Sequence, residues 1–188
     1  MGNRYCRILP CVAFAGIMSL AVSWDAGATV TGGTVPPALF TQLEQFHGHI
    51  CAGSLFGARM GVAAREALRD AGGEGRLKAR YYDLSCPLDG IQAGAGTTYG
   101  NADLMVEDRD EHRLVLTADG NKRQVEARLT RKAEELGLRS RELGKKARSL
   151  PQDSAERKRL EREIEGIFTW LRTAPTSEVV AITPGQVR

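Results

Sequence analysis

The chain has 188 residues and a formal net charge of +3, with 26% charged and 42% hydrophobic residues. This charge is too small to favour a nucleic acid as partner. The length suits one domain with a sizeable core, so the class of function must come from the motifs.

Residues 1–28 are predicted to form an export signal. Two arginines precede an apolar run from Ile8 to Val22, and Ala26-Gly27-Ala28 supplies the small residues of a cleavage site after Ala28. We therefore expect an exported, periplasmic protein that has no membrane segment after cleavage. The alternative is an uncleaved anchor, because the apolar run is nearly long enough to span a bilayer.

The mature chain is predicted to start with a flexible leader at 29–36, followed by a single domain at 37–188. Apolar spacing predicts a short helix that starts at the Pro36-Pro37 pair and a second helix from Gly53 or Ser54 to Asp70. Three glycines spaced four apart leave one face of the second helix without side chains: Gly53, Gly57 and Gly61. Close packing against another helix is the favoured explanation, with a partner subunit or a ligand as alternatives.

A strand is predicted over Leu77–Leu84, then a short helix with Asp89 as its N-cap, then a glycine-rich turn. Ala118-Asp119-Gly120-Asn121 predicts the turn of a hairpin between strands 112–117 and 122–130.

The remainder is predicted to contain two charged helices, at 131–149 and 153–172, and a last strand near 178–183. The predicted fold class is therefore α+β. An antiparallel sheet packs with helices, and a charged helical hairpin at 131–172 is added near the C-terminus.

Two histidines and a cysteine lie within five positions: His47, His49 and Cys51. Imidazole and thiolate are ligands that zinc and other transition metals prefer. Cys51 also lies just before a predicted helix, where the partial positive charge lowers a thiol pKa. The sulfur is therefore suited either to metal ligation or to nucleophilic attack.

A second polar cluster is formed by Cys86, Asp89 and Gln92. If the two clusters meet, the metal ligands are His47, His49, Cys51, Cys86 and Asp89, with zinc the first expectation and iron the second. Cys51, His49 and Asp89 are then the candidate catalytic residues, and Gln92 is expected to orient the carboxylate or to contact a bound cofactor or small ligand. The remaining histidine, His112, is predicted to be a surface residue.

Two alternatives remain open. Cys51 and Cys86 are the only cysteines left after signal cleavage, so they can form a disulfide that is either structural or part of a thiol redox module. The other alternative is a non-catalytic interaction domain, in which the apolar stripe of the helical hairpin is incompletely covered.

The segments Phe46-His47-Gly48-His49-Ile50-Cys51-Ala52-Gly53, Cys86-Pro87-Leu88-Asp89-Gly90-Ile91-Gln92 and Gly96-Thr97-Thr98-Tyr99-Gly100-Asn101 together resemble the FmdE family of formylmethanofuran dehydrogenase proteins. The resemblance implies an α+β domain that tends to form homodimers, with a Cys/His/Asp pocket as metal or active site. The chain departs from the family pattern at Ala52, where the family has proline, and at Thr97, where it has cysteine. The C-terminal zinc-ribbon cysteines of some relatives are also missing.

Overall fold

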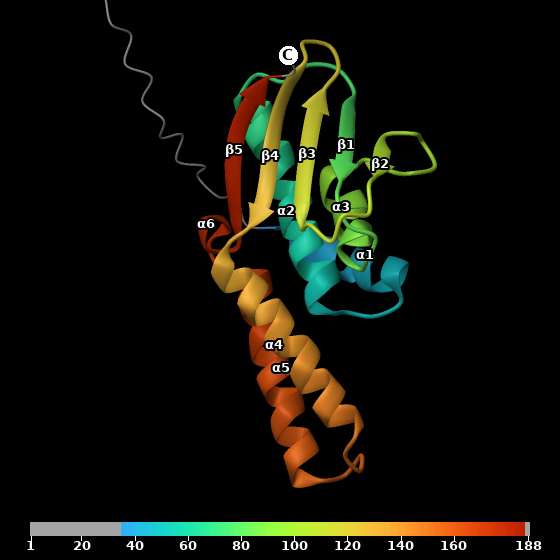
Figure 1. Cartoon of the computed structure of the whole chain (residues 1–188), viewed down its shortest axis with the longest axis vertical. Coiled ribbons are helices and arrows are strands. Elements are labelled where there is room, and N and C mark those ends of the chain that lie inside the picture. The colour runs from blue at the N-terminus through green and yellow to red at the C-terminus, as the bar shows by residue number, and fades with distance from the viewer. Residues whose placement is uncertain (1–34, 187–188) are drawn as a thin grey trace, which may run out of the picture.

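The structure is a computed structural model that describes residues 35–186, so the predicted signal peptide lies outside the described residues. A five-stranded sheet stands in front of helix α2, and a long helical hairpin extends away from both (Figure 1). In chain order the elements are α1 (Pro37–His47), α2 (Ala52–Asp70), β1 (Leu77–Tyr81), α3 (Pro87–Ala95), β2 (Leu104–Val106), β3 (Arg113–Ala118), β4 (Arg123–Leu129), α4 (Arg131–Arg148), α5 (Ala155–Thr173), α6 (Thr176–Val179) and β5 (Val180–Gln186).

The sheet has the strand order β2-β1-β3-β4-β5 and is antiparallel except for the parallel pair β1–β2. Burial alternates along β3 and β4, because successive side chains of a strand point to opposite faces. The inward residues of β3 and β4 are buried and share one hydrophobic core with α2. The predicted α+β class, with its mostly antiparallel sheet and charged helical hairpin, is confirmed.

Three local predictions were wrong or incomplete. Asp89 is not an N-cap, because α3 already begins at Pro87 and Cys86 takes the capping position. The strand predicted to start near residue 178 begins only at Val180, since the short helix α6 precedes it. Strand β2 was not predicted, because its three residues are too few to show an alternating pattern.

The glycines of α2 allow α3 to lie directly against the α2 backbone. A Cβ atom added at Gly57 would lie 2.1 Å from the Pro87 carbonyl oxygen, and one at Gly61 would lie 2.7 Å from the Ala95 nitrogen. The contact is reciprocal, because a Cβ at Gly90 of α3 would lie 2.2 Å from the Ser54 carbonyl oxygen. Close helix packing therefore explains the glycine stripe, and it fixes where α3 begins relative to α2.

Helices α4 and α5 pack side by side and project beyond the sheet (Figure 1). The buried Arg59 of α2 anchors the base of this hairpin, since its guanidinium donates hydrogen bonds to the carbonyl oxygens of Arg172 and Ala174. None of the described helices is long and apolar enough to cross a bilayer.

Replacing Gly57 by alanine is expected to destabilise the protein by about 3 kcal/mol, because the new methyl group meets backbone atoms that cannot move separately. Gly166→Ala in α5 is the matched control. No atom lies within 4 Å of its added Cβ, so this change is expected to stabilise the helix by about 0.5–1 kcal/mol. Urea unfolding measures both values, and equal effects of the two substitutions would contradict the close contact.

Candidate metal and thiol site

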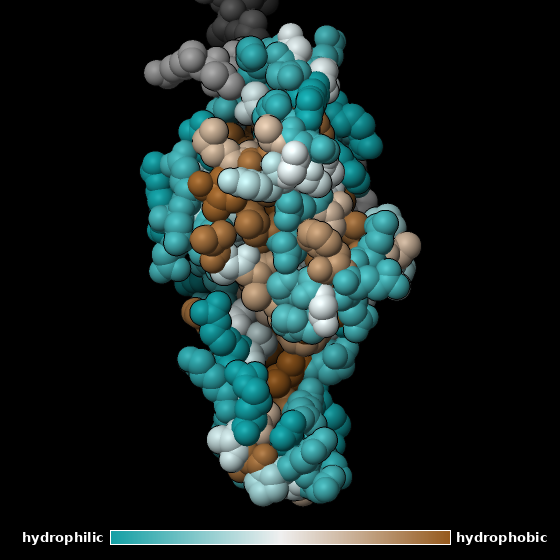
Figure 2. Space-filling model, turned by 90° about the vertical axis from the view of Figure 1, so that its right-hand side faces the viewer, coloured by the Kyte–Doolittle hydropathy of each residue, from teal (hydrophilic) through white to brown (hydrophobic). Residues whose placement is uncertain are grey.

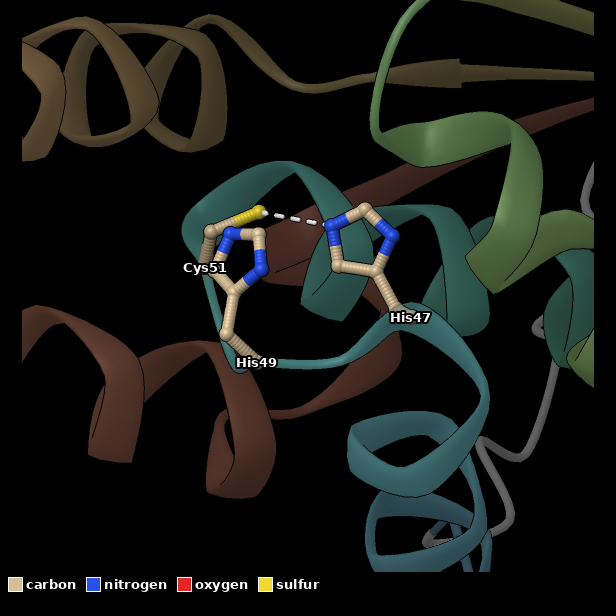
Figure 3. Close-up of side chains that lie close together, drawn as sticks. All are labelled: His47, His49 and Cys51. Atoms are coloured by element: carbon tan, nitrogen blue, oxygen red, sulfur yellow. Dashed lines mark hydrogen bonds between the residues drawn. The ribbon is translucent and has the colours of Figure 1, made fainter.

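The His47–His49–Cys51 cluster lies in the turn between α1 and α2 (Figure 3). His47 is the last residue of α1, and Gly48 then adopts a φ of +84° that reverses the chain direction. The chain returns to start α2 with Cys51 as its N-cap. One donor atom from each of the three residues lies within 4.8 Å of the other two.

Cys51 is held by a capping box at the start of α2. Its Sγ accepts a hydrogen bond from the Ser54 backbone N–H at 3.3 Å. In return, the Cys51 backbone N–H donates to the Ser54 hydroxyl at 3.2 Å. These reciprocal bonds fix the direction of the sulfur and satisfy two helix N–H groups that would otherwise lack partners.

His47 lies between Cys51 and α3 and contacts both. Its Nε2 is 3.8 Å from the Cys51 sulfur, and its Nδ1 is 2.7 Å from Oδ2 of Asp89. The amide of Gln92 donates to the other Asp89 oxygen at 3.3 Å, while its own oxygen accepts from the Tyr99 N–H. A carboxylate on Nδ1 fixes the ring orientation and leaves Nε2 to act toward the sulfur.

These contacts shift the ionisation of the two residues in opposite directions. Burial alone raises the pKa of Cys51, but the Ser54 N–H and hydroxyl, together with hydrogen bonds to His47 and Cys86, hold that pKa below its ordinary value. Burial alone lowers the pKa of His47, but the Asp89 and Cys51 hydrogen bonds raise it above the ordinary value. The geometry therefore favours a thiolate at Cys51 beside an imidazolium at His47.

Cys86 occupies the N-cap position of α3, next to the start of α2. Both cysteines are free thiols, and their side chains are within hydrogen-bonding reach of each other. Burial and the negative charge of Cys51 raise the pKa of Cys86. The pair therefore favours one thiolate, located on Cys51.

The predicted site residues thus divide into a central group and its supports. The histidine and cysteine donors of the first cluster converge, whereas Asp89 lies behind His47 and Gln92 lies behind Asp89. Cys86 lies beside Cys51, outside the group of three whose donor atoms are mutually close.

The prediction for His112 was wrong. Its ring packs on Phe56 with the ring centroids 5.0 Å apart, and its Nδ1 lies 3.0 Å from the Tyr81 hydroxyl and 3.3 Å from the buried Asp83 carboxylate. The signal was present in the sequence, since His112 continues the inward alternation of Leu114 and Leu116.

A cavity of about 490 Å³ opens between the site and the helical hairpin. The site side contributes His49, Cys51, Cys86 and His112, and the hairpin side is formed largely by α4. Figure 2 shows hydrophobic residues in a recess between the sheet-bearing part and the hairpin, bordered by hydrophilic residues. The cysteine and histidine cluster is therefore accessible to a small molecule.

This fold and site define an α+β protein whose chemistry centres on a histidine and cysteine cluster between two helix starts. The sequence model described as "FmdE, Molybdenum formylmethanofuran dehydrogenase operon" matches residues 46–181. The chain therefore belongs to the FmdE family, as its motifs predicted.

Among solved structures, the chain is similar to an FmdE-like protein of tungsten formylmethanofuran dehydrogenase from Syntrophus aciditrophicus. The TM-score is 0.53 at 17% sequence identity, over 80% of this chain and 72% of the other. This likeness supports the fold alone. No curated protein matches the chain significantly.

Cys51 is expected to react with iodoacetamide at lower pH than Cys86, although Cys86 is the more exposed residue. Since the pKa of Cys51 is lowered and that of Cys86 is raised, the half-maximal rate of Cys51 should come first in a titration over roughly pH 5–10. Mass spectrometry of the labelled peptides from metal-free protein measures both rates.

Two variants serve as controls for this titration. His47→Ala removes a hydrogen bond to the sulfur and should move the Cys51 profile to higher pH. Cys51→Ser removes the neighbouring negative charge and should move the Cys86 profile to lower pH. Coinciding profiles for the two thiols in the unmodified protein would show that the site does not activate Cys51.

Proposed function

We propose that the protein binds a transition metal ion through His47, His49 and Cys51, for metal handling or for metal-assisted chemistry on a small molecule. The observation that carries the proposal is the convergence of two imidazoles and one thiol within 4.8 Å. Membership of the FmdE family, whose name refers to a metalloenzyme operon, supports a metal-associated role.

The donor set fits zinc best, and iron second. Zinc is bound in proteins by imidazole nitrogen and thiolate sulfur, with neighbouring ligand atoms roughly 3.5–4 Å apart. The 3.8 Å separation of the Cys51 sulfur and His47 Nε2 agrees with this spacing. Asp89 has the position of the carboxylate that commonly supports a metal-binding histidine through its second ring nitrogen.

The adjoining cavity favours a reactive centre over a purely structural one. A structural zinc site is closed by four protein ligands, whereas a catalytic site keeps one position for water or substrate. Here Cys51 and His49 line a cavity of about 490 Å³, and Cys86 remains beside it as a further ligand or proton donor. A bound zinc ion would supply Lewis acidity there and lower the pKa of coordinated water.

A thiol redox function is the second candidate. The observation that favours it is the contact between the free thiols of Cys51 and Cys86. A low-pKa thiol beside a second thiol is the arrangement used for reversible disulfide exchange. In this case the protein as isolated would be about 2 Da lighter by intact mass than after reduction, and the bridged sulfurs could not serve as metal ligands.

We further propose that the protein is exported and acts as a homodimer. Export rests on the predicted signal at residues 1–28, which the structure does not describe. Dimerisation rests on the family resemblance and on exposed apolar side chains such as Met105 and Tyr99.

Protein purified without an affinity tag is expected to hold about one metal ion per chain, most of it zinc, by elemental analysis. Cys51→Ser and His47→Ala should lower the content to less than about 0.2 per chain, because each removes a donor. Serine still provides a hydroxyl N-cap, so the first change spares α2. His112→Gln should retain the metal. Metal content that is low in the unmodified protein, or unchanged in both site variants, would refute the proposal.

Asp89→Asn is expected to weaken zinc affinity about 10–100-fold while keeping one ion per chain, because the residue orients His47 rather than providing a main ligand. Competition with a zinc-binding dye measures the affinity. Loss of stoichiometric binding in Asp89→Asn would instead make the carboxylate a ligand, and unchanged affinity would show that the His47–Asp89 contact does not support the site.

A further inference from the structure

The α4 wall of the cavity combines small residues with two arginines. Gly137, Ser140 and Gly144 line the cavity at helical spacing and leave it open, since none has a large side chain. Arg141 and Arg148 line the same cavity and are seven positions apart, so they lie on one face of α4.

These two arginines differ from most basic residues of their helix. Arg131, Lys132, Arg139 and Lys146 each form an ion pair with a glutamate. Neither Arg141 nor Arg148 has an acidic partner within residues 35–186. Glu134 is the one acidic side chain on the described cavity wall, so the positive charge there exceeds the negative charge.

The rest of the wall indicates what kind of body an anion would need. Phe56, Leu129, Leu138, Ile164 and Phe168 all contribute to it. Such a mixture of apolar surface and a few charged groups is typical of sites that bind small organic molecules. Guanidinium groups bind carboxylates and phosphates through paired hydrogen bonds.

We propose that this cavity binds a small organic acid, whose anionic group meets Arg141 and Arg148 and whose apolar body extends toward Cys51 and His49. The inference rests on the proposed function in one respect, since it names the substrate class of the same metal site. Charge recognition by the arginines, however, can be measured with or without the metal.

The test is a titration of zinc-loaded and metal-free protein with acetate, hexanoate and benzoate, each compared with its neutral amide, followed by backbone amide NMR. We expect at least one acid to shift the Gly137, Gly144 and Cys51 signals, and its amide of the same shape to bind about tenfold or more weakly. Arg141→Gln and Arg148→Gln should each weaken the acid by about the same factor.

Lys145→Gln is the matched control. It removes one positive charge from the same helix at an exposed residue that does not line the cavity, so acid binding should stay within about twofold of the unmodified protein. An equal loss in Lys145→Gln would mean that only the overall charge of the hairpin matters, and the inference would fall.

The outcomes separate this inference from the proposed function. If zinc binds but no acid does at roughly 10 mM, or acids and amides bind equally, the metal site stands and the acid site is refuted. If an acid binds in an arginine-dependent way to protein that never takes up metal, the cavity assignment stands and the metal function fails.

Discussion

The backbone contact between α2 and α3 is the constraint on which the site depends. With glycines on both helices, the two backbones lie close enough that an added methyl group would overlap main-chain atoms. The contact places the N-cap of α3 beside the N-cap of α2, and each N-cap is a cysteine. It also sets Asp89, in the first turn of α3, against His47 at the end of α1. Side chains some forty positions apart therefore meet because two helices can touch without side chains between them.

The electrostatics of the site follow from this arrangement. Ser54, His47 and Cys86 all donate toward the Cys51 sulfur, while Asp89 holds the opposite edge of His47. Charge is thus arranged in alternation, with carboxylate, imidazole and thiolate in sequence across two helix starts. A cation at the imidazole and thiolate edge would complete this series, and the positive arginines of α4 lie on the far wall of the same cavity. The two ends of the cavity therefore suit different parts of one ligand.

Much of the fold and of the site was accessible from the sequence because the relevant signals were local. Apolar spacing located α1, α2, α4 and α5 closely, and the turn residues located the β3–β4 hairpin. The glycine spacing correctly indicated close helix packing. Proximity of ligand residues in sequence, within five positions, was itself enough to bring His47, His49 and Cys51 together.

What the sequence did not reveal depended on long-range contacts. The place of Asp89 behind His47, rather than at a helix cap, is decided by how α3 packs on α2. His112 joined the cavity because β3 pairs next to β1 and carries the ring under α2, and no local pattern specifies that pairing. The cavity itself exists only because the hairpin docks on α2 with small residues facing inward.

X-ray absorption at the zinc edge tests the central claim most directly, because it reports the atoms bound to the metal in the intact protein. We predict a first shell that combines nitrogen at about 2.0–2.1 Å with sulfur at about 2.3 Å, with the Cys51 contribution to the sulfur signal removed in Cys51→Ser. A shell of oxygen and nitrogen alone, identical in the unmodified and variant proteins, would show that the metal does not lie between the imidazoles and the thiolate.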